Sequence, residues 1–296
     1  MTKLNLSQEQ LKKLKTAVIG FGNMGKNHYR ILSEISSCNA VCDVDTAKLN
    51  NLPCATYSSV CEMLQGEKFD AVVIATPTKY HLDTIKAIQD KNTRILLEKP
   101  IAETITQAKM IEKEYPNVFV GHVERFNPAI LKFLELRDKL GDILSFSSVR
   151  VGINPPAYMK ADVMLDLGIH DIDLANLIIG GHPEFVGKQS RIVNPRNVSD
   201  IASMEIRYSN GVIAVIQTNW ITPIKIRRIE ITGTRGYVMI DLLAQTLTFY
   251  QKDRQEILTY KCQGESLRNE LIYFLNEPES NVKAAILALK ILNNKL

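Results

Sequence analysis

The sequence is poor in the features that define several large classes of protein. Its five cysteines are odd in number and show no C-x-x-C spacing, which argues against a disulfide framework or a structural zinc site and favours a reducing, cytoplasmic setting. No segment approaches the roughly 20 apolar residues of a membrane span, and the N-terminus lacks the apolar core of a signal peptide. The net charge is only +4 and no basic run is interleaved with aromatics, so no nucleic acid and no membrane is expected as a partner.

A glycine-rich turn follows the first apolar run of the chain and reads Gly20-Phe21-Gly22-Asn23-Met24-Gly25. Between a strand and a helix, the first glycine of this spacing permits a sharp turn, and the second lets the backbone approach a pyrophosphate. The third lets the helix pack against the strand, and the free amide groups at the helix N-terminus hold the phosphates. The spacing predicts a dinucleotide site, and an ordinary turn rich in glycine is the alternative.

An acidic residue stands where such a site needs one. Asp43 closes the next apolar run at the distance expected for a carboxylate that accepts hydrogen bonds from the ribose hydroxyls. The same carboxylate would repel a 2′-phosphate, and the next residue is Val44 rather than an arginine able to cradle that phosphate. The pair predicts NAD as the cofactor in preference to NADP.

The 296 residues suffice for two domains with substantial cores. The chain begins with a short amphipathic helix that has a capping box at Ser7 and Gln10. Strand candidates then lie at 16–20, 40–43, 70–75, 94–97 and 118–121, with helical segments such as 79–91 and 104–114 between them. This alternation predicts a parallel, doubly wound Rossmann sheet, with ligands at the carboxyl ends of its strands, in a domain over residues 1–121.

The second half of the chain has a different pattern. Asn210-Gly211 separates the strand candidates 202–208 and 212–219, which is a strong hairpin signal, and residues 233–236 mark a second hairpin. Helices are predicted at 163–179 and 282–292. The predicted fold class is therefore α/β, in which the Rossmann sheet is followed by an α+β domain over residues 122–296. This second domain has a large, mainly antiparallel open sheet and serves substrate binding and oligomerisation.

Two clusters of polar residues end later strand candidates of the first domain. Thr76 and Pro77, with His81 soon after, are placed to border the nucleotide crevice, although Thr-Pro is also common turn chemistry. Glu98 and Lys99 directly follow the next candidate, 94–97. An ammonium group there can stabilise an alkoxide or carbonyl oxygen as charge develops, or share in proton transfer. A structural salt bridge is the competing interpretation.

The third cluster lies in the predicted helix of the second half. If this segment is helical, Asp166, His170 and Asp173 share one face through i,i+4 and i,i+3 spacing. A carboxylate can orient the imidazole and stabilise its protonated form, which gives a competent general base. A surface pair is an equal alternative. A metal pair is a third, but no additional His or Cys has the spacing of a ligand, so no metal is predicted.

In order and spacing, these clusters together resemble the Gfo/Idh/MocA oxidoreductases, a family named for glucose–fructose oxidoreductase and inositol dehydrogenase. The matching segments are the glycine turn with His28, Cys42-Asp43-Val44-Asp45, Ala75-Thr76-Pro77 with His81, Glu98-Lys99-Pro100, Arg125-Phe126-Asn127-Pro128 and Asp166-x-Gly-x-His170. A late segment, 267–271, resembles one of the family's C-terminal helices. The resemblance covers nearly the whole chain except the N-terminal helix.

The resemblance implies an enzyme that moves a hydride between a nicotinamide cofactor and a secondary hydroxyl, often of a sugar or cyclitol. Lys99 corresponds to the family's active-site lysine, and Asp166 and His170 to its carboxylate and histidine partners. His170 would take the hydroxyl proton, Lys99 would steady the oxygen, and Asp166 would orient the histidine or bind the sugar. Which of Lys99 and His170 is the base differs within the family. The implied cofactor-binding set is Gly20, Phe21, Gly22, Asn23, Met24, Gly25, Asp43, Thr76, Pro77, His81, Glu98 and Lys99, and Pro100 matches a position often preceded by a cis peptide bond.

The stretch 120–128 is similar to the branch that acts on nucleotide sugars, particularly the 3-dehydrogenases of UDP-N-acetylglucosamine. Arg125 and Lys160 are candidate diphosphate partners, because guanidinium and ammonium groups pair well with phosphate oxygens. The implied substrate-binding set is Lys99, Arg125, Asp166 and His170. The chain departs from many relatives in lacking a run of glycines before Asp166. An inositol or free-sugar dehydrogenase, or a non-catalytic NAD(H)-binding regulator, therefore stays as an alternative function.

The second domain also suggests self-association. Ile213, Val215 and Trp220 are candidate members of an exposed apolar face of its sheet. Monomers seldom expose large apolar patches. The sequence therefore predicts a homodimer or homotetramer that acts on a small-molecule sugar or nucleotide sugar.

Overall fold

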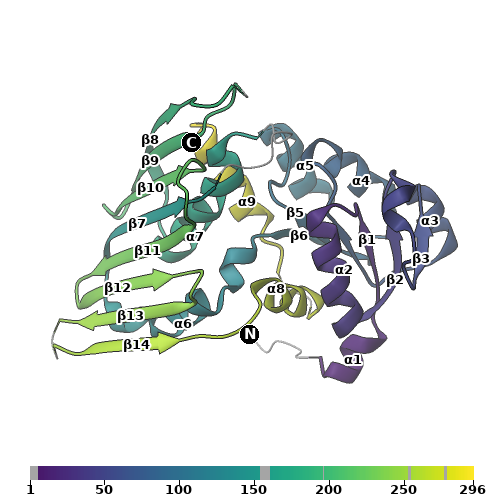
Figure 1. Ribbon diagram of the computed structural model, residues 1–296, viewed down its shortest axis with the longest axis horizontal. Coiled ribbons are helices and arrows are strands. Elements are labelled where there is room, and N and C mark those ends of the chain that lie inside the picture. The colour runs from purple at the N-terminus through teal and green to yellow at the C-terminus, as the bar shows by residue number, and fades with distance from the viewer. Residues whose placement is uncertain (1–5, 154–160, 196, 253–254, 277–278) are drawn as a thin grey trace. The chain divides into compact units, whose positions relative to one another are not determined.

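The computed structural model describes residues 6–153, 161–195, 197–252, 255–276 and 279–296 (Figure 1). The chain divides into two compact units. The first comprises Met1–Val123 and Leu267–Ile286, and the second comprises Glu124–Ser266 and Leu287–Leu296. The chain thus returns to the first unit late in its course, whereas the sequence predicts one continuous boundary after residue 121. Lys160, a predicted diphosphate partner, lies outside the described residues.

The first unit contains a six-stranded parallel sheet in the order β3-β2-β1-β4-β5-β6 (Figure 1). Its strands are β1 Lys15–Ile19, β2 Ser37–Cys42, β3 Ala55–Tyr57, β4 Ala71–Ile74, β5 Arg94–Glu98 and β6 Val118–Gly121. β4 and β6 are buried along their whole length, as expected for apolar strands covered on both faces. The strand order reverses between β1 and β4, and the crevice at such a switch point is where this architecture binds ligands. The predicted doubly wound parallel sheet is confirmed.

Helices α2 Asn23–Ile35, α3 Val60–Gly66, α4 His81–Ala87 and α5 Ile105–Glu114 connect these strands, with short 3₁₀ turns at η1 Thr46–Leu49 and η2 Thr78–Tyr80. Two further helices are α1 Gln8–Lys13, which precedes β1, and α8 Ser266–Leu275, which follows the strands of the second unit. The predicted capping box of α1 is present, because Ser7 and Gln10 each accept a hydrogen bond from the other's backbone N–H. α4 is shorter than the predicted helix over 79–91, since the chain leaves the helical conformation at Ile88. In the described part of the chain, no helix is both long and apolar enough to cross a lipid bilayer.

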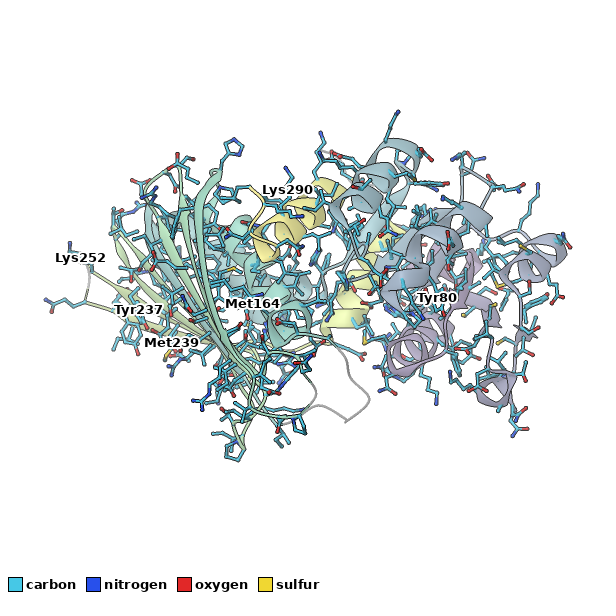
Figure 2. The ribbon with its side chains drawn as sticks, turned by 90° about the horizontal axis from the view of Figure 1, so that it is seen from above. Tyr80, Met164, Tyr237, Met239, Lys252 and Lys290 are labelled. Carbon is cyan, nitrogen blue, oxygen red and sulfur yellow. The ribbon has the colours of Figure 1, made fainter. Side chains whose placement is uncertain are left out.

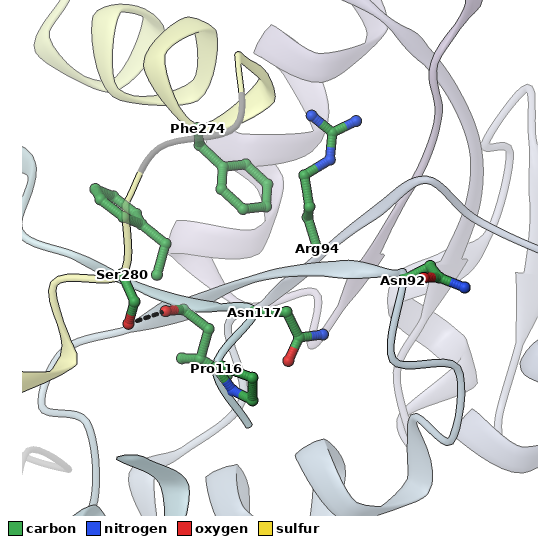
Figure 3. A pocket seen from close by; sticks show the side chains of 8 residues that line it. Asn92, Arg94, Pro116, Asn117, Phe274 and Ser280 are labelled. Atoms are coloured by element: carbon green, nitrogen blue, oxygen red, sulfur yellow. Dashed lines mark hydrogen bonds between the residues drawn. The ribbon is translucent and has the colours of Figure 1, made fainter. Parts of the chain in front are cut away.

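The returning segment of the first unit is fixed beside β5 and β6 (Figure 3). Arg94 donates through Nη1 to the backbone oxygen of Leu275, the last residue of α8, at 2.6 Å. Ser280 donates through Oγ to the backbone oxygen of Val118 at 2.8 Å, and the Asn281 side chain bonds both the N–H and the C=O of Val120. Because β6 is the edge strand, Ser280 and Asn281 satisfy backbone groups of β6 that no neighbouring strand reaches.

The second unit contains an eight-stranded sheet in the order β14-β13-β12-β11-β7-β10-β9-β8. Its strands are β7 Ile143–Val151, β8 Pro183–Arg191, β9 Ile201–Tyr208, β10 Ile213–Asn219, β11 Ile226–Gly233, β12 Gly236–Asp241, β13 Thr246–Gln251 and β14 Ile257–Lys261. All neighbours are antiparallel except β7 and β10, so the prediction of a mainly antiparallel sheet is confirmed. The predicted hairpin turns join β9 to β10 and β11 to β12.

Helices α6 Pro128–Leu136 and α7 Ile169–Ile179 pack on one face of this sheet (Figure 1). Short turns lie at η3 Val123–Phe126, η4 Arg137–Leu140 and η5 Met164–Gly168, and the chain closes with α9 Val282–Leu292. The sequence predicts one α-helix over 163–179. The structure instead has a π-helical turn, η5, ahead of α7.

The opposite face of the sheet carries Tyr237 and Met239, which Figure 2 shows on the side away from Met164. Ile213 belongs to this face and is 43% exposed. Trp220 does not, so its predicted place on the exposed face is wrong. It is buried, and its Nε1–H donates to Oδ1 of Asp200 at 2.7 Å. The reason is the period-two alternation of strands, which turns an even-numbered residue here toward the helices.

Candidate active site

The glycine turn after β1 is fixed by the fold at two of its three glycines. Gly20 has φ +93°, and a Cβ there would lie 2.7 Å from the backbone of Ala75. A Cβ on Gly25 would lie 1.9 Å from the backbone oxygen of Gly20. Both positions therefore require glycine for chain geometry alone, because an added carbon would collide with backbone. Phe21, between them, is buried and packs edge-on against Tyr29.

Gly22 differs from the other two glycines. Among the described residues, a Cβ there would meet nothing within 4 Å, and the backbone has φ −76°, which any residue adopts. Gly22 is also the N-cap of the 13-residue helix α2 and makes no side-chain cap bond. Open space thus lies directly beside the first amide groups of α2. A helix N-terminus with unsatisfied N–H groups favours an anion, so this position fits a pyrophosphate.

The carboxylate of Asp43 follows β2 and is only 9% exposed. Its Oδ2 accepts the N–H of Phe21 at 2.6 Å, and its Oδ1 accepts the N–H of Asp45 at 2.8 Å. Lys48 places its Nζ 3.4 Å from Oδ1. Burial acts to raise the pKa of Asp43, but these backbone hydrogen bonds and the charge of Lys48 lower it overall. The carboxylate of Asp43 is therefore ionised and is held beside the glycine turn by its hydrogen bond with Phe21.

A cavity of about 890 Å³ opens where the carboxyl ends of β1, β2 and β4 meet. Among the predicted cofactor-binding residues it brings together Gly20, Gly22, Asn23, Met24, Asp43, Thr76 and Pro77. The sequence reasoning missed Lys48, Ser58 and Ser59 in its wall. The position of Lys48 in a helical turn five residues after Asp43 is the signal that could have found it. The size of the cavity is that of a cofactor site.

His81 lies behind this wall. It is 1% exposed, and its Nε2 is 3.0 Å from the backbone oxygen of Thr76, with Nδ1 3.4 Å from that of Ile101. Burial lowers the pKa of His81 despite these carbonyls, so the ring is neutral and donates to one of them. The nearer oxygen belongs to Thr76. The structure therefore gives His81 a role in holding the Thr76 loop, and its predicted contact with a cofactor stays a prediction.

Glu98 is the last residue of β5 and Lys99 follows it, and neither is among the residues that line this cavity. Glu98 is buried, and its Oε1 lies 2.7 Å from Nε2 of His28 on α2. Its Oε2 accepts the backbone N–H of Lys99 at 3.2 Å. Lys99 is half-buried, and the bond between Lys99 and Pro100 is cis, as the resemblance implies.

In the second unit, Asp166 lies in the π-helical turn and His170 in the first turn of α7, and both side chains are half-buried. A π turn bonds residue i to i+5, so the i,i+4 geometry expected between them does not apply there. Asp173, the third predicted member, is 1% exposed. Its two carboxylate oxygens accept hydrogen bonds from Nε and Nη2 of Arg125, each at 2.6 Å. Asp173 and the predicted phosphate partner Arg125 thus neutralise one another.

A buried ionic network underlies this part of the second unit, and the sequence analysis did not anticipate it. Arg150 on β7 is 2% exposed and pairs with Asp171 and with Glu124, and Glu124 also accepts from Arg227 at 3.2 Å. Burial acts to raise the pKa of Glu124, but the two arginines lower it overall. Charged residues at inward positions of β7 and β11 are the only sequence signal for this network. In the described part of the chain, no three His, Cys, Asp or Glu residues are grouped to hold a metal ion.

Two family models match the chain. The model described as the oxidoreductase family with an NAD-binding Rossmann fold matches residues 14–117. The model of the GFO/IDH/MocA C-terminal domain matches residues 137–239. The two matches together span both units and more than half of the sequence.

Individual relatives include dehydrogenases of sugars and of inositols. The UDP-N-acetylglucosamine 3-dehydrogenase of Acidithiobacillus ferrooxidans is 28% identical over 250 residues, which are 81% of this chain and 77% of that protein. A solved structure of that enzyme has a TM-score of 0.86 at 26% identity, and the match covers 95% of this chain and 96% of that one. Inositol 2-dehydrogenase 2 of Mycolicibacterium vanbaalenii is 27% identical, over 78% of this chain and 74% of that protein.

Proposed function

Because the chain belongs to the Gfo/Idh/MocA family of NAD-binding oxidoreductases, we propose that its substrate is a nucleotide sugar such as UDP-N-acetylglucosamine and that its cofactor is NAD. Membership makes the protein an NAD(P)-dependent dehydrogenase that acts on CH–OH groups. In the proposed reaction, a hydride moves between the cofactor and a secondary hydroxyl or ketone of the sugar.

The observation that carries the cofactor proposal is the open space at Gly22. The fold itself explains why residues 20 and 25 are glycine, but it gives no reason for glycine at residue 22. A pyrophosphate against the amide groups of α2 supplies that reason. The ionised carboxylate of Asp43 would bind the ribose hydroxyls and disfavour a 2′-phosphate. When bound, NAD supplies the nicotinamide ring that accepts the hydride.

The catalytic roles follow the chemistry of each side chain. His170 would take the proton of the substrate hydroxyl, because a neutral imidazole is an effective base near pH 7. The ammonium group of Lys99 would stabilise the oxygen as negative charge develops on it. Asp166 would orient His170 or accept a hydrogen bond from the sugar. Glu98 acts through the backbone of Lys99, which it holds by a hydrogen bond.

The relatives support the substrate class. A UDP-N-acetylglucosamine 3-dehydrogenase matches this chain in sequence and, over 95% of its length, in structure. Inositol dehydrogenases match at similar identity, which makes a cyclitol the second candidate.

We also propose a homodimer or homotetramer, supported by the apolar residues of the uncovered sheet face around Ile213, which is 43% exposed. Light scattering of the purified protein measures this directly.

Absorbance of the reduced nicotinamide tests the proposed reaction. The protein is mixed with NAD or NADP and a panel of UDP-sugars, free sugars and inositols. We expect turnover with a UDP-sugar and NAD, and loss of turnover in both Lys99→Ala and His170→Ala. Lys109→Ala, which changes an exposed lysine of α5, is the matched control. Turnover of an inositol alone would replace the proposed substrate class. Binding of NADH without turnover on the whole panel would favour a regulator.

A further inference from the structure

Two arginines stand side by side on the helix-covered face of the second unit's sheet. Arg227 of β11 is the cross-strand partner of Arg150 of β7, so their side chains leave the sheet in the same direction. Each of the three guanidinium nitrogens of Arg150 has a carboxylate partner within the protein. Its Nε and Nη2 lie 2.8 and 2.9 Å from Asp171, and its Nη1 lies 2.7 Å from Glu124. Arg150 is therefore a structural residue.

Arg227 has the same neighbours but far fewer hydrogen bonds. Its one bond within the described residues runs from Nη1 to Oε1 of Glu124, at 3.2 Å. The side chain is 36% exposed, so most of it is withdrawn from water. Its Nε and Nη2 have no acceptor in the part of the chain that the structure describes. These two groups form the edge of a guanidinium that binds a carboxylate or phosphate in a fork.

The surroundings of Arg227 favour an anionic ligand. Burial and the charge of Arg150 lower its pKa, and Glu124, Asp171 and Asp166 oppose that shift. A cation that is partly buried with one hydrogen bond gains stability when an anion completes its shell. The charge of Asp166 acts on the pKa of Arg227, so Arg227 lies within electrostatic reach of a residue that we assign to the active site.

Arg125, the arginine that the sequence suggests for this task, has its fork occupied. Both of its donors at that edge bond to the carboxylate of Asp173 at 2.6 Å. We infer that Arg227, rather than Arg125, binds the substrate's phosphate oxygens through its Nε–Nη2 edge. This inference rests on the proposed nucleotide-sugar substrate, whose diphosphate is the anion in question.

The charges near Arg227 indicate whether it would bind a phosphate by net positive charge or by the geometry of its guanidinium. Two arginines face Glu124 and Asp171, so the network is formally neutral before Asp166 is counted. These four charges alone therefore give the phosphate no net positive charge to meet, and we expect its binding to depend on the planar geometry of the guanidinium. A lysine at residue 227 would retain the charge and lose the fork, so it should restore little of the affinity.

Calorimetric titration of UDP into the NADH-loaded protein tests the assignment, with uridine as the probe that lacks phosphate. In Arg227→Met, we expect the Kd of UDP to rise roughly 10- to 100-fold, the range for loss of a charged hydrogen-bonded pair. The Kd of uridine should change less than about two-fold, because uridine has no group for the fork. Arg228→Met is the matched control, since Arg228 points to the other face of β11 and pairs with Glu230.

Steady-state kinetics separate positioning from packing. For UDP-N-acetylglucosamine, Arg227→Met should raise KM and leave kcat nearly unchanged, whereas a damaged fold would also lower NADH affinity and the melting temperature. If that variant does not fold, Arg227→Lys decides, and it too should bind UDP at least about 10-fold more weakly. Unchanged UDP binding in these variants, or an equal loss for uridine, overturns the role of Arg227 alone. Wild-type protein that neither binds UDP nor oxidises the UDP-sugar overturns the proposed substrate together with this inference.

Discussion

The imidazole of His28, which has no exposed surface, lies 2.7 Å from the carboxylate of Glu98. His28 belongs to α2, the helix that starts at the glycine turn, and Glu98 ends β5. The second oxygen of Glu98 holds the backbone N–H of Lys99. The pair therefore ties the helix of the nucleotide site to the backbone of the proposed catalytic lysine, within one unit.

Glu98→Gln should make the protein less stable in a pH-dependent way. Burial acts to raise the pKa of Glu98, but the hydrogen bond and charge of His28, with the charge of Lys99, lower it overall. The unfolded chain then binds the proton more readily, so the stabilisation is complete above the unfolded pKa of about 4.3 and is lost as pH falls through the folded pKa. We expect a deficit of about 1.5–3 kcal/mol at pH 7.

Thermal melts of wild type and Glu98→Gln between pH 3 and 7 measure this deficit. It should shrink as the solution is acidified, because protonation removes the charge that the variant lacks. Glu114→Gln, at an exposed position of α5, should run parallel to wild type. A deficit that stays constant across the pH range would contradict the assignment of an ionised Glu98.

Gly25 and Gly22 should respond differently to alanine. Gly25→Ala forces a Cβ to 1.9 Å from the backbone oxygen of Gly20, and we expect a loss of about 1–3 kcal/mol in stability, typical of overpacking. The added methyl of Gly22→Ala meets no atom of the described residues within 4 Å. The stability of this variant should fall by no more than about 1 kcal/mol, the cost of alanine in place of a favourable residue at an N-cap.

NADH binding separates the two variants further. Gly22→Ala should weaken NADH by at least about 10-fold, or about 1.4 kcal/mol, because the added methyl occupies the space assigned to the pyrophosphate. Fluorescence titration and thermal melts on the same samples give both quantities. Wild-type NADH affinity in Gly22→Ala would place the pyrophosphate elsewhere.

Local pattern was sufficient for much of the fold. Val118–Gly121 is an apolar run between turns, and the structure has a strand with those bounds. The hairpin at Asn210-Gly211 follows from turn chemistry, since Gly211 adopts φ +82°. The period-two alternation of strand residues determines the position of Trp220. Ile213 and Val215 share a parity, and Trp220 has the other, so alternation alone places it on the buried face.

Features that depend on distant residues were beyond such patterns. The partners of Arg150 lie 21 and 26 residues away in sequence, and no spacing rule connects them. The π-helical turn around Asp166 also breaks the period that predicts one α-helix. In the candidate site, the residue types and the glycine spacing were readable. Which arginine keeps an open hydrogen-bonding edge was not, because that depends on ion pairs formed only in the fold.

Asp43→Asn should relax the preference for NAD. The amide retains one acceptor for the backbone N–H of Phe21 but removes the charge that would repel a 2′-phosphate, and Lys48 then has no carboxylate at residue 43 to neutralise it. We expect kcat/KM with NADP, relative to NAD, to rise by at least about 10-fold. Asp45→Asn is the control, because Asp45 also pairs with Lys48 but is half exposed. An equal change in both variants would assign the effect to Lys48 rather than to Asp43.

Arg150→Met should be the most damaging of these substitutions. Burial acts to lower the pKa of Arg150, but Asp171 and Glu124 raise it overall, so the cation is held by two buried carboxylates. Removal of the guanidinium leaves both of them without this partner, at a cost of about 3–5 kcal/mol. Arg228→Met, which breaks only an exposed pair with Glu230, should cost no more than about 1 kcal/mol.

The pH dependence of Arg150→Met provides the sharper measurement. A buried carboxylate without its cation has a raised folded pKa, so the variant should gain stability relative to wild type as pH falls from 8 toward 5. Arg150→Met combined with Asp171→Leu should recover part of the loss at pH 8, because one buried charge is removed and apolar packing replaces it. Urea denaturation at both pH values measures each effect. A loss below about 1 kcal/mol that does not depend on pH would mean that solvent reaches Glu124 and Asp171 once Arg150 is gone.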